Sequence, residues 1–294
     1  MKRSVVPDTN SDFGRYGPPT LLRSLISFAQ NCPHNWLGQQ LAQIVRKLVL
    51  WAGPLPIDVT VGPVKMRCYL RDNSAEKKFV FMPWRYDRRE RQLLLEALPR
   101  NGVFVDIGAN VGIYTLVVAT HLSSQGRILA LEPNPPAFER LCFNLRATRS
   151  GRSEWPAIDA LRVAVADDTR EVYLHLDRED LGCSSIAPRA AALASKDSAA
   201  QAEVVRVSCK PLLALLKERS IPRVDALKID IEGAEDLALV PYLREAADDA
   251  LPKTIVIENS EHRWKLDLVG ALADRGYAAR MRSRMNTVYR RHGG

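Results

Sequence analysis

The stretch that decides the fold of this chain is Val103-Phe104-Val105-Asp106-Ile107-Gly108-Ala109-Asn110-Val111-Gly112. Its apolar run predicts a buried parallel strand that ends beside an acidic residue. Gly108 and Gly112 bracket Asn110 in a predicted tight turn, where a side chain on either glycine would fill a ligand's space. The apolar pattern of residues 113–122 predicts a buried helix. A strand, a glycine turn and a helix in this order begin a βαβ unit that binds a nucleotide-like ligand at its turn.

The spacing of the polar residues in this turn indicates which ligand it binds. A dinucleotide fingerprint reads G-x-G-x-x-G without an acid two residues before it, whereas residues 106–112 read D-x-G-x-N-x-G. With no phosphate to bind, Asp106 and Asn110 suit the ribose and the amino-acid tail of S-adenosylmethionine. A second predicted strand, residues 127–132, ends in Glu132, and an acid there accepts hydrogen bonds from both ribose hydroxyls. The predicted function is methyl transfer, with a cofactor site formed by Asp106, Gly108, Asn110, Gly112, Glu132 and Asp167.

Length and charge bound the domain organisation and the partners. A chain of 294 residues can form one large α/β domain with an appendage, or two small domains. Its formal net charge of +8 divides into +8 for residues 1–100, −6 for 101–262 and +6 for 263–294. Basic flanks around an acidic core suggest an acidic partner, such as nucleic acid, anionic lipid or an acidic glycan. The alternative is a solvated arginine-rich surface.

Cysteine usage and the N-terminus predict a cytoplasmic protein. The five cysteines contain no C-x-x-C pair, which argues against a disulfide framework or a structural zinc site and for a reducing cytosol. No apolar segment follows Met1-Lys2-Arg3, so we expect no signal peptide. No apolar run approaches the ~18 residues of a transmembrane helix. Peripheral contact with the inner membrane stays open.

The N-terminal part is predicted to be an extension, residues 1–75, ahead of a methyltransferase domain at residues 76–294. Glycine and proline among polar residues favour a loose arm at residues 1–19. The helix predicted at residues 36–51 is amphipathic, so it docks on its own domain, on a partner subunit or on a membrane surface. The other segments expected here are a helix at 20–28, strands at 57–61, 64–70 and 78–82, and a helix at 85–98 that begins with a charged run.

The remaining strands of the predicted sheet lie in the second half of the chain. We expect buried strands at 161–165, 224–230 and 254–257, a helix at 264–275, an antiparallel hairpin at 277–291, and a strand at 171–176 outside the parallel order. Residues 181–201 are rich in small residues and are predicted to form a mobile loop that contacts the substrate.

A second polar cluster, Lys228-Ile229-Asp230-Ile231-Glu232-Gly233-Ala234-Glu235, follows one of these strands. Strand alternation places Lys228 and Asp230 on one side. Asp230 and Glu232 fall at the carboxyl edge of the sheet, where open α/β sheets bind their ligands. The cluster therefore predicts the catalytic side of the site.

Together these motifs resemble the FkbM family of S-adenosylmethionine-dependent methyltransferases. The resemblance rests on residues 104–112, 130–134, 163–165 and 227–235 and covers about residues 102–276. It implies an α/β fold of the class I methyltransferase type, a Rossmann-like doubly wound seven-stranded sheet. It also implies O-methylation of a hydroxyl on a sugar, a glycolipid or polysaccharide, or a polyketide-type product. One departure is Lys210-Pro211-Leu212, where family members often carry a Leu-Asp pair at the start of a helix.

Methyl transfer from a sulfonium requires an aligned acceptor oxygen and a group that takes its proton. Asp230 is the first candidate for this catalytic base, Glu232 the next, and His262 the third. In the alternative interpretation, Asp230 and Glu232 only hold the strand–helix turn and the methionine ammonium. A Mg²⁺ variant also fits, with Asp230 and Glu258-Asn259 as oxygen ligands of a cation that bridges two substrate hydroxyls.

Two functions from other classes compete with this one. A nucleic-acid methyltransferase would explain the basic flanks, but no RNA-binding module or catalytic cysteine motif supports it. A non-catalytic, membrane-associated scaffold would use the helix at residues 36–51. The identity of the acceptor and the oligomeric state stay open at this point.

Overall fold

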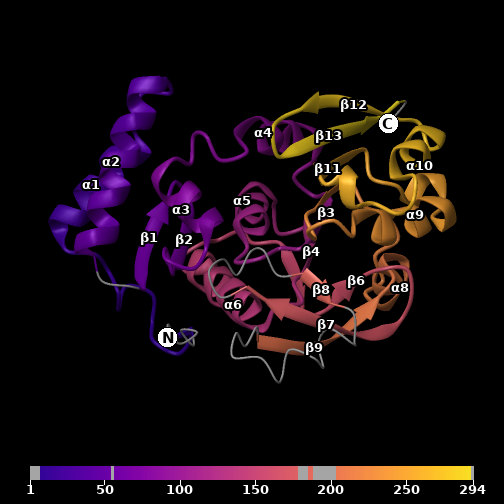
Figure 1. Ribbon diagram of the computed structural model, residues 1–294, viewed down its shortest axis with the longest axis horizontal. Coiled ribbons are helices and arrows are strands. Elements are labelled where there is room, and N and C mark those ends of the chain that lie inside the picture. Colours follow the sequence, from indigo (N-terminus) through magenta and orange to yellow (C-terminus); the bar gives the residue numbers. More distant parts are fainter. Residues whose placement is uncertain (1–6, 54–55, 178–184, 188–202, 293–294) are drawn as a thin grey trace.

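A seven-stranded sheet lies at the centre of the protein. The computed structural model describes residues 7–53, 56–177, 185–187 and 203–292 (Figure 1). The strand order is β12-β13-β11-β10-β3-β4-β5. The strands are β3 (Val103–Ile107), β4 (Arg127–Leu131), β5 (Ala157–Leu161), β10 (Ala226–Ile229), β11 (Thr254–Glu258), β12 (Tyr277–Arg282) and β13 (Asn286–Arg291). The first five of these pair in parallel, and the predicted terminal hairpin adds β13 and β12 antiparallel.

Helices cover both faces of this sheet, because successive strand side chains point to opposite faces. Val105, Leu129 and Leu227 face one helix layer, whereas Phe104, Ile128 and Ala226 face the other. The first layer is α8 (Leu212–Glu218), α9 (Glu235–Glu245) and α10 (Leu268–Asp274). The second layer is α4 (Arg88–Ala97), α5 (Ile113–His121) and α6 (Pro135–Arg149). The predicted doubly wound α/β fold is confirmed.

The strand order reverses next to β3, and this reversal positions the site. The chain runs from β3 to β4 on one side, and later returns to β10 on the other side of β3. Crossover connections leave the two neighbouring strand ends in opposite directions, which opens a crevice at their carboxyl edge.

The third strand of the core differs from the prediction. The central sheet uses β5 at Ala157–Leu161, and the predicted segment instead contributes β6 (Ala164–Val165) to a second sheet. That sheet has the order β6-β9-β7-β8, with β7 (Arg170–Leu176), β8 (Ser185–Ala187) and β9 (Glu203–Lys210). An edge strand such as β5 is half-exposed and lacks a continuous apolar run, which explains the error. The strand predicted outside the parallel order is confirmed as β7, whereas most of the predicted loop at residues 181–201 lies outside the described residues.

Two local boundaries were wrong because capping signals were overlooked. Residues 78–82, predicted as a strand, belong largely to the helix α3 (Ser74–Phe81). The side chain of Asn73 caps this helix by accepting a hydrogen bond from the backbone N–H of Glu76. The helix predicted at 264–275 begins only at Leu268, where Asp267 forms the cap.

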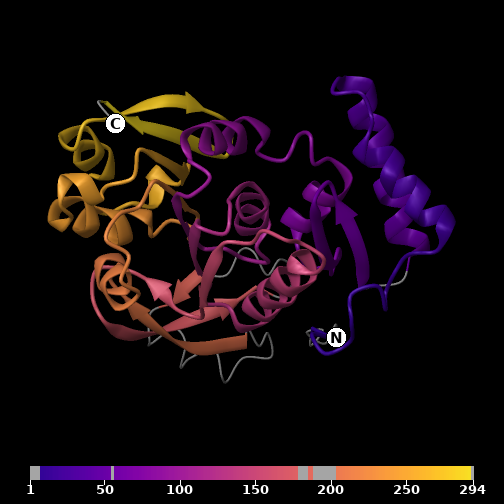
Figure 2. The same ribbon diagram turned by 180° about the vertical axis from the view of Figure 1, so that it is seen from behind.

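The N-terminal elements lie at one end of the molecule (Figures 1 and 2). They are α1 (Thr20–Gln30), α2 (Trp36–Ala52) and the hairpin of β1 (Ile57–Val61) and β2 (Val64–Cys68). The hairpin packs on α6, where Asn144 accepts a hydrogen bond from the backbone N–H of Arg67 at 2.9 Å. Over the described ranges, no helix combines the length and the apolarity needed to cross a bilayer.

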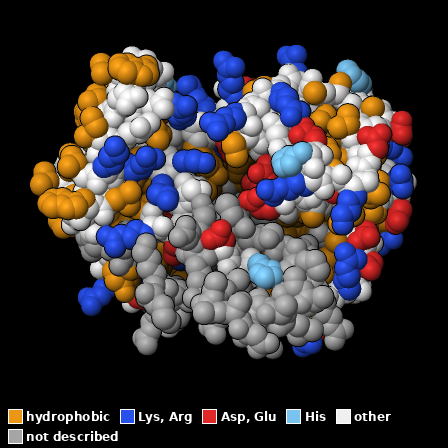
Figure 3. Space-filling view, in the orientation of Figure 1, with side chains coloured by type: hydrophobic (Ala, Val, Ile, Leu, Met, Phe, Trp, Pro, Cys, Tyr) orange, Lys and Arg blue, Asp and Glu red, His pale blue; other side chains and the backbone are white. Residues whose placement is uncertain are grey.

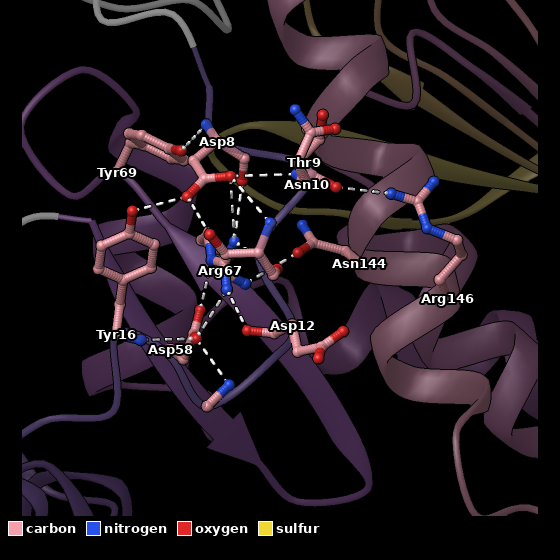
Figure 4. A network of polar contacts seen from close by, with 12 residues as sticks. Asp8, Thr9, Asn10, Asp12, Tyr16, Asp58, Arg67, Tyr69, Asn144 and Arg146 are labelled. Carbon is pink, nitrogen blue, oxygen red and sulfur yellow. Dashed lines mark hydrogen bonds and ion pairs between the residues drawn. The ribbon is translucent and has the colours of Figure 1, made fainter.

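The segment predicted as a loose arm is held in place from Asp8 onward by the buried side chain of Arg67 (Figure 4). Its guanidinium donates to the carboxylate of Asp58 and to the backbone carbonyls of Asp8, Ser11 and Asp12. It also lies 4.7 Å from the ring centroid of Tyr16. The loose-arm prediction was wrong because turn residues indicate where a chain bends and not what it contacts.

Candidate active site

A cavity of about 200 Å³ opens at the carboxyl edge of the central strands. The ends of β3, β4, β10 and β11 form its floor, through residues such as Asp106, Glu132, Asp230 and Glu258. Its walls come from α3, the second sheet and the turn before β13. Figure 3 shows acidic side chains beside the hollow near the centre of this face. The topological crevice expected from the strand order is therefore a physical cavity.

The glycine turn follows β3 and has the strained backbone that its sequence predicts. Gly108, Asn110 and Gly112 have φ angles of 74°, 51° and 94°. A Cβ on Gly108 would lie 1.9 Å from the backbone oxygen of Asp230, and one on Gly112 would lie 2.5 Å from a methyl carbon of Leu141. The protein's own packing therefore requires glycine at position 108, where a Cβ would meet backbone, and the positive φ favours glycine at position 112. Gly108 lines the cavity, whereas Gly112 is not among the described lining residues.

Glu132, at the end of β4, is 6% exposed and faces the cavity. Its two oxygens accept hydrogen bonds from the backbone N–H groups of Asn110 and Asn134, at 2.7 and 2.8 Å. Burial raises the pKa of Glu132 to about 7, and these two hydrogen bonds oppose the rise. A carboxylate oxygen has two lone pairs, so each oxygen keeps the capacity to accept a further hydrogen bond.

Asp106 is fully buried at the cavity wall. Its Oδ2 accepts a hydrogen bond from the Thr115 hydroxyl at 2.6 Å, whereas its Oδ1 is buried without a partner. Burial raises the pKa of Asp106, and the charge of Lys228 opposes this rise. A buried acceptor without a donor is costly, so this atom fits a ligand that donates a hydrogen bond into the cavity.

Lys228 lies between Asp106 and Asp230 at the centre of the site. Its Nζ is 3.0 Å from Asp230 Oδ2 and 3.4 Å from the backbone oxygen of Gly108. The β3–β10 register places Lys228 directly beside Asp106. Burial lowers the pKa of Lys228, but the charges of Asp230 and Asp106 outweigh it, so the pKa is raised and the ammonium stays charged.

Asp230, Glu232 and Glu258 form one acidic cluster. The polar segment at residues 228–235 predicts the first two of them at this edge of the sheet. Carboxylate oxygens of all three lie within 4.8 Å of one another. Burial, followed by repulsion from Asp230 and Glu232, raises the pKa of Glu258 to about 8. Its Oε2 is buried without a hydrogen-bond partner. Three hard oxygen ligands suit a divalent cation, and without one this arrangement favours a proton on Glu258.

The predicted metal ligand Asn259 is engaged elsewhere. Its side chain donates to the backbone oxygen of Ser283 at 2.9 Å and accepts from the Thr287 hydroxyl at 2.7 Å. Asn259 therefore links β11 to the terminal hairpin. The third carboxylate beside Asp230 and Glu258 is Glu232, at the position expected for Asn259.

The strand–helix turn after β10 is held by a residue other than those considered in the sequence. Glu235 Oε1 accepts hydrogen bonds from the backbone N–H groups of Ile231 and Gly233, at 3.0 and 3.1 Å. Glu235 thus accepts from two backbone donors of this turn, and Asp230 and Glu232 both line the cavity.

The structure does not bring His262 and Asp167 to the cavity. His262 is exposed on the 3₁₀ turn Glu261–Arg263, and Asp167 pairs with Arg170 at 2.9 Å on the surface. Asp167 follows the segment predicted as a core strand at residues 161–165. It lies elsewhere because the preceding residues pair with β9 in the second sheet.

Sequence reasoning missed a further polar group in the lining of the cavity. The Tyr114 hydroxyl donates to Asp87 Oδ2 at 3.2 Å, and Tyr86 lies beside them in the cavity lining. Burial raises the pKa of Asp87 and of both tyrosines. The charged run at residues 85–91 reads as a solvated helix start, and only the positive φ of Asp87, 42°, marks it as unusual.

The strand order and this acid-lined crevice define a methyltransferase of the class I fold. A family model described as the methyltransferase FkbM domain matches residues 106–291. Since the match spans more than half of the chain, the protein belongs to the FkbM methyltransferase family.

Curated relatives share part of the chain. AMB antimetabolite synthetase AmbE of Pseudomonas aeruginosa is 27% identical over 227 residues, which is 67% of this chain and 10% of that protein. Methyltransferase sdnD of Sordaria araneosa is 30% identical over 158 residues, which is 47% of this chain and 59% of that protein. The chain thus spans only part of the length of both relatives.

Solved structures of methyltransferases also match. The FkbM methyltransferase of Methylobacillus flagellatus KT is 16% identical with a TM-score of 0.41, over 75% of this chain and 56% of that one. TYW2 of M. jannaschii, in complex with AdoMet, is 11% identical with a TM-score of 0.38, over 80% of this chain and 86% of that one.

Proposed function

We propose that the protein is an S-adenosylmethionine-dependent O-methyltransferase. Its acceptor is a hydroxyl of a sugar, a glycolipid or polysaccharide, or a polyketide-type product. One observation carries the proposal: two buried strand-end acids, Asp106 and Glu132, keep acceptor capacity toward the same cavity as the Asp230 cluster. The residues proposed to bind the cofactor and those proposed to bind the acceptor therefore line the same cavity.

The cofactor part fits S-adenosylmethionine by the chemistry of its donors. Glu132 would accept hydrogen bonds from the ribose hydroxyls, and Asp106 Oδ1 would accept one from the ammonium group. When bound, S-adenosylmethionine supplies an electrophilic methyl group. The protein's own task is to hold the acceptor in line and to take its proton.

Asp230 is the residue best placed to take that proton. Lys228 donates to its Oδ2 and so fixes the rotamer of this carboxylate at the mouth of β10. Its Oδ1 would accept the proton of the acceptor hydroxyl, and a positioned base of this kind contributes roughly 10²- to 10⁴-fold to the rate. Glu232 and Glu258, within 4.8 Å, would join Asp230 in holding Mg²⁺ if the enzyme uses it.

Labelled-methyl transfer from S-adenosylmethionine to nucleotide sugars, glycolipids and polyketide-type alcohols tests the proposal. We expect Asp230→Asn to lower the rate roughly 10²- to 10⁴-fold. Asp167→Asn, which changes an exposed acid outside the cavity, should leave it unchanged. Loss of activity with EDTA, restored by Mg²⁺, would assign the metal to this cluster.

Cofactor binding is measured separately by isothermal titration. Glu132→Gln should weaken S-adenosylmethionine binding by about 10- to 100-fold, the value of a hydrogen bond to a charged group. A wild-type protein that binds no S-adenosylmethionine at millimolar concentration would contradict the proposal. Binding without transfer to any hydroxyl acceptor would retain the cofactor and reject O-methylation.

A further inference from the structure

The outer surface of the N-terminal helices is apolar. Leu37, Ile44, Leu48 and Trp51 of α2 are 57%, 53%, 47% and 85% exposed. Their spacing of 7, 4 and 3 residues places them along one side of the helix for its whole length. Figure 3 shows hydrophobic side chains gathered at the left edge, where Figure 1 places α1 and α2. The outer face, as we call it, comprises Leu21, Phe28, Trp36, Leu37, Ile44, Leu48 and Trp51.

The opposite side of α2 is already used in folding. Ala42, Val45 and Val49 are buried in the N-terminal core cluster, Gly38 is buried as well, and α2 packs against α1. The sequence left open whether this helix docks on its own domain, on a partner subunit or on a membrane surface. In the structure its buried residues are small, whereas Leu37, Ile44 and Leu48 are exposed and Leu41 and Leu50 are partly buried. Within the described residues, nothing covers the outer face. A contiguous exposed apolar surface of this kind marks a binding surface.

The charge around the outer face selects its partner. Residues 13–57 contain no aspartate or glutamate, and their charged residues are Arg15, Arg23, Arg46 and Lys47. A twofold contact with a second copy would bring these cations against themselves. An anionic surface, by contrast, complements them. Trp36 and Trp51, at the two ends of α2, are side chains that favour the boundary between water and lipid.

We propose that the outer face binds the surface of a bilayer that contains anionic lipid. The apolar stripe of α2 enters the headgroup boundary, and the exposed Lys47, which flanks the stripe, contacts the lipid phosphates. Both helices pack on α3, which also supplies Ser74, Ala75 and Lys78 to the cavity wall. The outer face is therefore linked to the cavity through α3. The proposal stands independently of the reaction that the cavity catalyses.

Flotation of the full-length protein with vesicles tests this surface. The vesicles are phosphatidylcholine alone, or phosphatidylcholine with phosphatidylglycerol. We expect binding to the anionic vesicles, weakened by salt, and about ten-fold or greater loss in the double variant Leu48→Ser/Trp51→Ser. The double variant Leu266→Ser/Val269→Ser is the matched control, because these side chains are also exposed, at 38% and 48%, but lie at the start of α10, at the other end of the fold (Figure 1). It should bind like the wild type.

Tryptophan fluorescence gives a second readout, which nonspecific binding to vesicles would not change. Addition of anionic vesicles should shift the emission to shorter wavelength, and Trp51→Phe should reduce the shift while leaving flotation unchanged. Equal flotation with both kinds of vesicle, or none with either, overturns the proposal. So does a dimer in light scattering that Leu48→Ser/Trp51→Ser dissociates, because the outer face would then bind a second copy.

Discussion

Lys228 Nζ lies 3.0 Å from Asp230 Oδ2, and the β3–β10 register places the same lysine beside Asp106. One buried ammonium thus stands between the proposed base and a proposed cofactor ligand. Its side chain is 7% exposed, so water screens little of its charge. The two halves of the site are joined electrostatically through this one residue.

Lys228→Met should separate catalysis from cofactor binding. Without the ammonium, Asp230 loses its fixed rotamer, so we expect kcat to fall about 100-fold, while the Kd for S-adenosylmethionine rises less. Lys228→Arg should restore part of kcat because it keeps the charge. Lys253→Met, at an exposed lysine, is the control. An equal loss in kcat and in cofactor affinity would show that Lys228 only supports the fold.

The buried acids make stability depend on pH in a defined direction. The pKa values of Glu258 and Glu132 are raised to about 8 and about 7, so the folded state binds more protons than the unfolded state between about pH 4.5 and these values. Stability is therefore highest near pH 5 and falls as the pH rises toward 8. Thermal unfolding from pH 5 to 9 should show this fall in Tm, and Glu258→Gln should flatten it. A wild-type Tm that rises over this range would contradict the prediction.

Gly108→Ala should test whether packing requires the first turn glycine. The new Cβ would meet the Asp230 backbone oxygen at 1.9 Å, so we expect a loss of stability on the order of 2 kcal/mol or more. Gly151→Ala is a matched control, because Gly151 also has a positive φ, 81°, but nothing lies within 4 Å of its Cβ position. Urea unfolding of both variants isolates the contact from the backbone strain. Equal losses of unfolding free energy in the two variants would show that the contact with Asp230 does not require glycine at position 108.

Arg67→Met should release the N-terminal segment that Figure 4 shows bound. Breaking a buried ion pair costs about 3–5 kcal/mol, because Asp58 stays buried without its partner. Arg146→Met is the control, since Arg146 also donates to this segment, at the Thr9 carbonyl, but in an exposed position. Limited proteolysis should cleave near residues 8–17 in the first variant alone. Protection in both variants would show that other contacts hold the segment.

Edge strands and surface turns were the weakest part of the prediction. The half-exposed β5 was missed because its residues alternate poorly, while the apolar run that follows it belongs to the second sheet. The placement of Asp167 failed with it. Asp87 and Tyr114 could not be paired from sequence, because 26 intervening residues and a strand separate them.

The sequence by itself determined the nucleotide-type turn at residues 106–112 and the acids that follow its predicted strands, because each is written in contiguous residues with a local backbone requirement. The doubly wound strand order was implied only by the resemblance to the FkbM family. Only the tertiary structure decided which acids meet. Parallel pairing brings β3, β4, β10 and β11 to one edge, so that Asp106, Glu132, Asp230 and Glu258 share a cavity although the chain separates them. It also decided that α2 buries its small residues and turns its tryptophans outward, since packing follows the shape of the neighbouring surface and not the hydrophobic pattern alone.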